Sequence, residues 1–438
     1  MKTYLYLILI VTFTLQTVNA QKIITKKEAI QIALKNNYGI LLANNQLKVA
    51  KNNASIYNAR LLPTVTANGG FNFDLSNQET ETQAGVTNKT TGIHTKTYNA
   101  SIGANYTLFD GNGRKYNYKA LKESYNLSEL EVKEAIENTY IRLFNVYFQI
   151  ARLSENTAIL KEALQISKQR FLRATYQYEY GKATKLEVLN AKVDINNDSI
   201  NLINTQQQFT NAKRDLNSIL VQQKDINYTV ETDVTFTSLF TFDGLYKKSL
   251  ENNVVLKQQE KNIAISKFNA KASTSGLFPT IGLSTSYGWN LSDNATTAQF
   301  AQFTSNGLKA GVNLSWNIFD GGNSKTRIAN SKIAVENQEI IQKQQIDNLK
   351  NVLQNTWDAY QNQLYVLKVQ KQNVLTAQDN FERTNEHFKL GQVGSIQFRQ
   401  AQINLLNTQT AVNNAKFDAK LIEISLLQLS GQLLDVAF

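Results

Sequence analysis

Apolar and polar residues alternate along a stretch that occurs twice in the chain. Every second residue from Tyr98 to Leu108 is apolar or alanine, and Asn, Ser, Gly and Thr fill the positions between them. The same alternation runs from Leu308 to Ile318, with Lys309 in the polar set. A period of two places the two sets on opposite faces of a β-strand, and about ten residues cross a bilayer as a tilted strand. Both stretches therefore predict membrane-length strands with one apolar and one polar face.

Each of these strands leads into a very long helical pattern. The runs cover 113–180 and 322–390, and each would be roughly 100 Å long at about 1.5 Å per residue. Return helices are predicted over 184–220 and 394–430, the first with apolar residues at coiled-coil spacing. The turn from strand to helix needs a capping aspartate and flexible glycines, and the candidates are Asp110, Gly111, Gly113, Asp320, Gly321 and Gly322.

The second half of the chain repeats the first. The only two prolines, Pro63 and Pro279, stand at the same repeat position, where each β-hairpin is expected to begin. With no other proline in the chain, long uninterrupted helices are possible. The predicted segments are a signal peptide at 1–20, a first repeat at 21–221 with a β-hairpin at 63–109, an equatorial connector at 222–242, and a second repeat at 243–438 with a β-hairpin at 279–319.

The beginning of the chain has the features of a secretory signal peptide, with basic Lys2, an apolar run and a small-residue cleavage site ending at Ala20. One helix is then predicted from Thr25 to about Arg60, where the following Leu-Pro ends it. The polar residues 76–96 predict an exposed loop between the first two strands. No later segment is apolar enough for a transmembrane helix, so any insertion into a membrane would have to use strands.

Composition argues against nucleic-acid binding and against catalysis. The net charge is +11, but Lys and Arg are scattered among Asp and Glu without a dense basic run. There is no cysteine, and His94 and His387 lie far apart with no ligand spacing around either. No phosphate-binding or dinucleotide-binding glycine motif is present. We therefore expect no catalytic residues, no metal, no cofactor and no nucleic-acid partner.

Four strands are too few to close a barrel, and open strand edges are not tolerated in hydrocarbon. Several chains must therefore pool their strands if these strands lie in a membrane. Two chains would give eight strands and a filled interior, whereas three would give twelve strands and a wider lumen. The small polar residues of one face suit a water-filled pore. A soluble β-sandwich with one wet face is the alternative, but it leaves the long helices without an evident place.

The tandem halves, the Leu62-Pro63-Thr64 and Phe278-Pro279-Thr280 strand starts and the two Phe-Asp-Gly turns together resemble the TolC-like outer-membrane efflux proteins. The resemblance covers essentially the whole mature chain. It implies an α+β fold in which a homotrimer forms one twelve-stranded barrel in outer-membrane lipid, continued by an α-helical coiled-coil barrel in the periplasm. It also implies a periplasmic adaptor and an inner-membrane pump or exporter as partners.

In this family the turns between the long helices form the periplasmic entrance and meet the adaptor. The resemblance therefore assigns adaptor contact to Gly181, Lys182, Ala183, Gly391, Gln392 and Val393. Some members narrow the entrance with two aspartates, and Gln397 and Gln400 stand at those positions, while Glu187 keeps a carboxylate in the first repeat. Glu187 could equally be an ordinary solvated helix residue, and Gly181 and Gly391 also fit plain helix C-caps.

The expected function is a passive outer-membrane exit duct of a tripartite efflux or type I secretion system. The alternative is a periplasmic coiled-coil scaffold or adaptor without a pore. Sequence features do not distinguish drug, ion and protein cargo.

Overall fold

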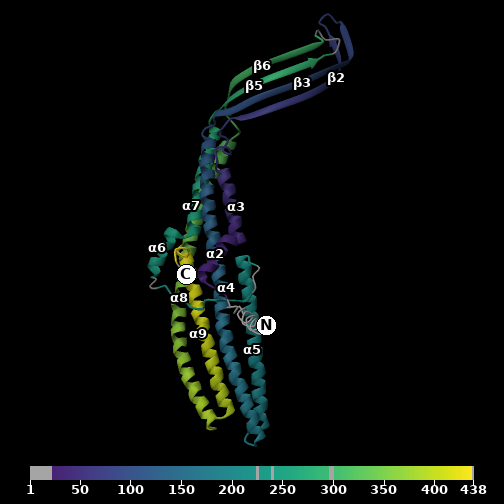
Figure 1. Ribbon diagram of the computed structural model, residues 1–438. Coiled ribbons are helices and arrows are strands. Elements are labelled where there is room, and N and C mark those ends of the chain that lie inside the picture. The colour runs from purple at the N-terminus through teal and green to yellow at the C-terminus, as the bar shows by residue number, and fades with distance from the viewer. Residues whose placement is uncertain (1–21, 223–225, 238–240, 295–299, 437–438) are drawn as a thin grey trace, which may run out of the picture. The chain divides into compact units, whose positions relative to one another are not determined.

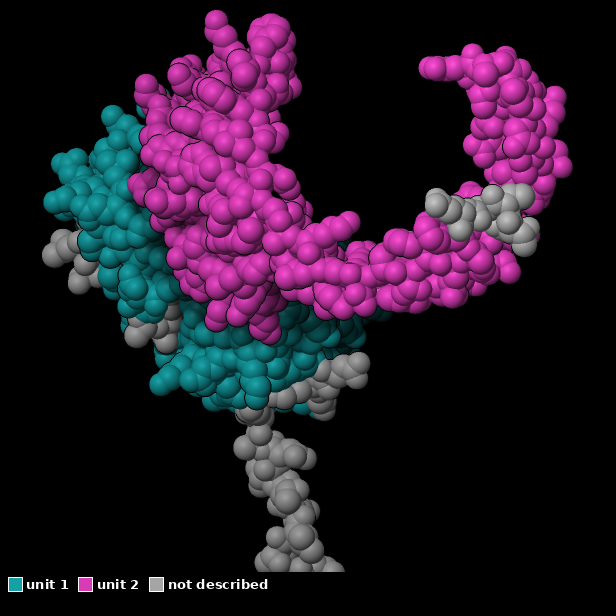
Figure 2. Space-filling view, turned by 90° about the horizontal axis from the view of Figure 1, so that it is seen from above, with its two compact units in different colours: residues 1–45, 130–257, 344–438 teal, residues 46–129, 258–343 magenta. Residues whose placement is uncertain are grey.

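The computed structural model describes residues 22–222, 226–237, 241–294 and 300–436. The predicted signal peptide lies outside these residues. Two compact units divide the chain: unit 1 takes residues 1–45, 130–257 and 344–438, and unit 2 takes 46–129 and 258–343 (Figure 2). Each unit therefore combines segments from both halves of the sequence.

The strands of unit 2 form one four-stranded antiparallel sheet in the order β2-β3-β5-β6 (Figure 1). Their bounds are β2 Thr64–Glu81, β3 Thr87–Phe109, β5 Thr280–Asp293 and β6 Gln302–Ser315. Pro63 and Pro279 directly precede β2 and β5, so the missing N–H of each proline falls outside the ladder. The second hairpin ends at Ser315, before the predicted limit of 319.

The loop predicted at 76–96 is wrong. Most of these residues belong to β2 and β3, which pair as far as Glu81 and Thr87 and leave a short turn in which Gly85 has a φ of +77°. Cross-strand neighbours explain the difference, because polar β-branched threonines pair well on a solvated sheet surface. An ion pair of 3.1 Å between Lys89 and Glu79 adds to this pairing.

The register places apolar residues opposite apolar residues in the central part of the sheet. Ile102 lies opposite Ala67 on one side and Tyr287 on the other, and Tyr287 lies opposite Leu308. One face is therefore mainly apolar. The other face carries small polar residues, as in the row Gly103, Ser286 and Lys309.

The helices are α2 Lys26–Asn36, α3 Tyr38–Asn53, α4 Gly113–Glu179, α5 Lys185–Leu220, α6 Phe242–Asn252, α7 Val254–Ser273, α8 Asn323–Lys389 and α9 Ser395–Leu429, with a 3-10 turn η1 at Thr274–Leu277. The α+β class is confirmed, with helix as the larger part. Among the described residues, none of these helices has both the length and the hydrophobicity of a membrane span.

The single helix predicted from Thr25 to Arg60 is two helices, α2 and α3, and the second ends at Asn53. Asn37 separates them with extended backbone, and its side-chain Oδ1 accepts a 2.9 Å hydrogen bond from Gly39 N. Its Nδ2 donates to Ile219 O at the end of α5 over 3.1 Å. An asparagine can end one helix and cap the next, so the break needs neither proline nor glycine.

The second repeat breaks in the same way between α6 and α7. Asn253 Oδ1 accepts hydrogen bonds from Val255 N and Leu256 N, and its Nδ2 donates to Leu429 O over 3.0 Å. In both copies one asparagine thus joins the start of the repeat to the end of its return helix.

A small parallel sheet completes unit 1 and was not predicted. Strand β1 Lys22–Ile24 pairs with β4 Tyr228–Val230, which lies in the predicted connector at 222–242. Buried Tyr147 on α4 joins the two strands, since its hydroxyl donates to Ile24 O over 2.8 Å and accepts from Glu231 N over 3.0 Å. Burial raises the pKa of the Tyr147 phenol, which keeps the hydroxyl protonated as a donor.

Candidate functional site

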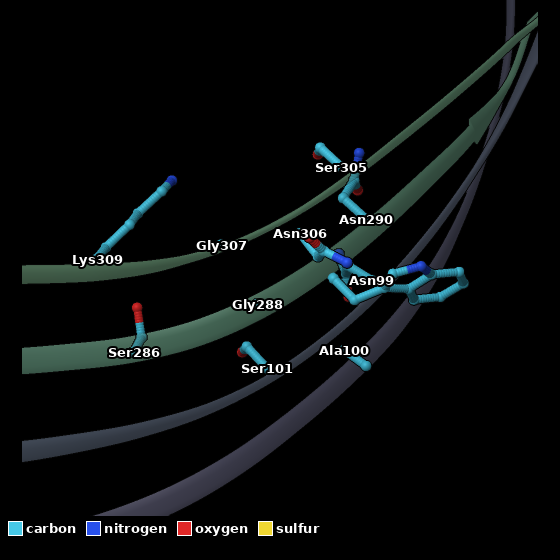
Figure 3. A pocket seen from close by; sticks show the side chains of 11 residues that line it. Asn99, Ala100, Ser101, Ser286, Gly288, Asn290, Ser305, Asn306, Gly307 and Lys309 are labelled. Atoms are coloured by element: carbon cyan, nitrogen blue, oxygen red, sulfur yellow. The ribbon is translucent and has the colours of Figure 1, made fainter.

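The polar face of the sheet carries a hollow of about 360 Å³ (Figure 3). Its lining comes from three neighbouring strands and includes Asn99, Ser101, Ser286, Gly288, Asn290 and Lys309. Short hydroxyl, amide and glycine residues leave this face wettable and open. The arrangement is suited to lining an aqueous passage.

Aspartates cap the long helices where the strands end. Asp110 Oδ2 accepts hydrogen bonds from Arg114 N and Arg114 Nε, both over 3.0 Å. Asp320 accepts from Ser324 N over 2.8 Å and from Gly322 N over 3.1 Å. Hydrogen bonds from Ser324 and Gly322 lower the pKa of Asp320. Both carboxylates therefore accept backbone N–H groups at the start of a long helix.

The glycines at these turns differ from the prediction in one position. Gly111, Gly321 and Gly322 have φ values of +65°, +69° and +90°, in the left-handed region that glycine adopts without strain. The second left-handed residue of the first turn is Asn112 at +65°, and Gly113 is the first residue of α4. Gly113 is needed for close packing instead, because a Cβ there would lie 2.8 Å from Ser275 Oγ.

The tips of the long helices are closed by matching glycine turns. Gly181 and Gly391 have φ values of +70° and +78°, and Lys182 N and Gln392 N donate to carbonyl oxygens of the last helical turn over 2.7 and 2.9 Å. Both glycines are therefore helix C-caps. Nothing lies within 4 Å of a Cβ built on either glycine, so both tips are open to solvent in the chain as described.

The three residues proposed for an entrance constriction lie near one another at the tips but do not form one group. Glu187 and Gln400 line the same hollow of about 500 Å³, together with Arg399. Gln397 lines a separate hollow of about 370 Å³, which it shares with Gln400. Gln397 Oε1 also accepts a 3.3 Å hydrogen bond from Gly394 N and so caps the first turn of α9.

A buried ionic cluster lies beside these tips and was missed in the sequence. Arg399 donates two hydrogen bonds of 2.8 Å to the carboxylate of Asp198, and Arg170 pairs with Asp194. Burial alone would lower the pKa of Arg399, but its hydrogen bonds and ion pair with Asp198 outweigh this and raise the pKa. Two aspartates four residues apart on a largely neutral helix were the signal that could have indicated the cluster.

Neutral polar groups complete the cluster. Gln402 Nε2 donates to Ala163 O over 2.8 Å, and Ser167 Oγ contacts both Gln402 and Asp198. The cluster thereby links α4, α5 and α9 within unit 1. Throughout the part of the chain that the structure describes, no group of three or more Asp, Glu and His side chains is placed to hold a metal ion.

The chain matches the family described as outer membrane efflux protein over residues 29–221 and 245–432. It is 21% identical to the outer membrane protein TolC of Vibrio cholerae serotype O1 over 67% of each chain. It is 20% identical to the outer membrane efflux protein BepC of Brucella suis biovar 1 over 92% of this chain and 84% of that one. The solved CmeC outer membrane channel of Campylobacter jejuni superposes with a TM-score of 0.77 and 16% identity, over 93% of this chain and 85% of that one.

The protein belongs to the outer membrane efflux protein family and is a TolC-like outer membrane protein. The family match covers both halves of the chain and leaves out residues 222–244, which contain the connector.

Proposed function

We propose that three copies of this chain form a passive exit duct that crosses the outer membrane and continues through the periplasm. The observation that carries the proposal is the two-faced sheet of unit 2. One face is mainly apolar on all four strands, and the other carries mainly small polar residues. Such a sheet suits lipid on one side and water on the other.

The edge strands of the sheet support a barrel that is shared by several chains. Within the described residues β2 and β6 each pair on one side only, so both edges present free backbone N–H and C=O groups. In hydrocarbon these groups need partners, and the β6 edge of one chain meeting the β2 edge of the next would supply them. Three chains close twelve strands and leave a lumen, as the resemblance implies.

The helices offer a second assembly surface. A seam of apolar residues on α5 stays at least half exposed in the single chain, at steps of three, four and seven residues: Leu186, Leu189, Val193, Ile200 and Ile203. This spacing is that of a coiled-coil contact. The seam is therefore suited to packing against a neighbouring copy, which would extend the duct as a ring of helices.

We further propose that the tips meet a periplasmic adaptor, which connects the duct to an inner-membrane pump or exporter. Exposed Tyr180, Leu390 and Ile396 beside the glycine turns supply apolar contact area for such a partner. The proposed contact residues remain Gly181, Lys182, Ala183, Gly391, Gln392 and Val393. Two neutral glutamines at the entrance positions disfavour an acidic ring there, and leave Glu187 as the one carboxylate among the three candidates.

Covalent trapping tests the assembly directly, because the chain has no cysteine. Ala67→Cys on β2 would be combined in turn with Leu308→Cys, Ala310→Cys and Val312→Cys on β6, all on the apolar face. Oxidation of membranes should give a ladder that ends at three chains for the pair in register. Each single variant is the control and should stay monomeric on a denaturing gel. A ladder that continues beyond three, or detergent-free release of monomers into the periplasm, would instead support the scaffold alternative.

A further inference from the structure

The polar face of the sheet carries a lysine, Lys309, although the lining of a water-filled passage does not by itself require a charged residue there. It lies opposite Ser286 on β5, which in turn lies opposite Gly103 on β3. Its neighbours on the same face of β6 are Gly307 and Gly311, and a Cβ built on Gly307 would meet nothing within 4 Å. Lys309 therefore lines the hollow together with small glycine and serine residues and with asparagines (Figure 3).

Among the described residues of the four strands, no acidic side chain lies at the level of Lys309 on the polar face. Asp74 is the one other charged residue on the polar face of β2 between Thr64 and Ser76 and of the strand segments that pair with this stretch. It lies opposite Thr95 on β3. Thr95 is eight residues along β3 from Gly103, which is about 27 Å at 3.4 Å per residue. That separation exceeds the Debye length of about 8 Å at physiological ionic strength, so Asp74 does not cancel the field of Lys309.

The other strand charges lie away from Lys309. Lys96 and Asp293 face each other on the apolar side of the sheet, in register with Phe73. The ion pair of Lys89 with Glu79 lies near the end of the first hairpin. A water-filled passage along the polar face would therefore meet Lys309 as its cation in the central part of the sheet.

We propose that Lys309 makes the barrel lumen selective for anions, so that carboxylate, sulfate or phosphate groups pass more readily than cations. The inference rests on the proposed trimeric duct, in which three copies of Lys309 form a ring at one level. Rings of lysine or arginine select anions in pores, and low-dielectric walls focus the field of such a ring into the lumen. Glycine and serine around it leave the ammonium groups accessible to the passing ion.

Accessibility is tested first. In membranes, Lys309→Cys should react with a water-soluble thiol reagent that does not enter lipid, whereas Ile102→Cys on the apolar face should not. Because the chain has no cysteine, each variant carries a single reactive group. A Lys309→Cys variant that forms trimers and stays unreactive would overturn the inference while leaving the duct intact.

Selectivity is tested next, from the reversal potential of the purified protein in planar bilayers under a potassium chloride gradient. Lys309→Gln should lower the ratio of chloride to potassium permeability, by up to about tenfold at low salt, and Lys309→Glu should lower it further. The differences should shrink near about 1 M salt, where the Debye length is about 3 Å. Lys96→Gln and Lys96→Glu are the matched controls and should leave the ratio unchanged.

The outcomes separate the inference from the proposed function. If the natural protein, Lys309→Gln and Lys309→Glu all form conducting channels with the same permeability ratio, the role of Lys309 is refuted and the proposed duct is not. If the crosslinked trimer does not form, both the proposed duct and the proposed anion selectivity are refuted.

Discussion

Arg399 on α9 and Asp198 on α5 are joined by two hydrogen bonds of 2.8 Å, one from each terminal nitrogen of the guanidinium group. The two residues come from different repeats, 201 positions apart in the sequence. The carboxylate of Asp198 is almost fully buried, and Arg399 is about one-seventh exposed, at 14%. A bidentate pair in this setting fixes the relative position of the two return helices.

Removal of the charge at Asp198 should loosen the tips. Asp198→Asn removes the carboxylate that accepts both 2.8 Å hydrogen bonds of Arg399 and leaves the guanidinium only the longer ion pair with Asp194, at 3.5 Å. The cost should therefore be below the roughly 3 kcal/mol of a buried pair that is broken completely. Faster hydrogen exchange in 185–200 and 395–405 is the expected result. The control is Asp379→Asn, which breaks an exposed ion pair with Arg383 and should change little. Equal protection of the tips in both variants would show that the cluster does not hold them.

The two helix-breaking asparagines allow a matched comparison between repeats. Asn37→Ala and Asn253→Ala each remove one cap and one hydrogen bond to the end of a return helix. Each variant should lose about 1–2 kcal/mol of stability, with the larger loss at Asn253, which is 8% exposed. Thermal unfolding in detergent measures the difference. If neither substitution changes the unfolding temperature, the asparagine hydrogen bonds that both repeats share do not contribute to stability.

Gly111 and Gly321 occupy the same turn of their repeats but should tolerate alanine differently. Both have positive φ, which costs an L-residue about 1–2 kcal/mol. At Gly111 the new Cβ would also lie 2.8 Å from Ser275 O and 2.9 Å from Phe278 Cβ, whereas at Gly321 nothing lies within 4 Å. Gly111→Ala should therefore reduce the yield of folded protein in the membrane well below that of Gly321→Ala. Similar yields of the two variants would contradict the packing argument.

Glu137 on α4 should make stability depend on pH. Its side chain is 1% exposed, its Oε1 accepts no hydrogen bond from the described residues, and Lys133 Nζ lies 3.9 Å away. Burial raises the pKa of Glu137 from 4.5 to about 7, with smaller opposing and reinforcing effects from Lys133, Glu134 and Asp435.

The folded state therefore holds the Glu137 proton more tightly than the unfolded state does. The free energy of unfolding should fall as pH rises from 4.5 to 7, by up to about 3 kcal/mol, since one pKa unit corresponds to about 1.4 kcal/mol. Glu137→Gln should be more stable than the natural protein at pH 8 and should lose this part of the pH dependence. A parallel decline of both proteins across that range would exclude Glu137 as its source.

Long periodic segments were predictable because many residues carry the same signal. The alternation from Tyr98 to Leu108 and the glycine turns at Gly181 and Gly391 correspond closely to the observed strand and tip turns. The asparagine breaks were not predicted, because Asn37 ends a helix through a partner, Ile219, that lies 182 residues away.

Features that depend on distant partners were missed for the same reason. Strand β1 is three residues long and pairs with β4 about two hundred residues later, which no local pattern shows. The polar segment 76–96 was expected to be a loop because its composition, not its cross-strand pairing, was visible. The cluster of Arg399 with Asp198 likewise exists only once α5 and α9 are brought together.

The free edges of β2 and β6 have a genetic consequence. In the proposed trimer each chain pairs its two edges with two neighbours, so one chain with a damaged edge disrupts an assembly whose other members are intact. In that assembly the share of fully intact trimers falls as the cube of the fraction of intact chains. A variant with a defective β6 edge, produced together with the natural chain, should therefore act as a dominant inhibitor, whereas a variant that fails to fold at all should be recessive.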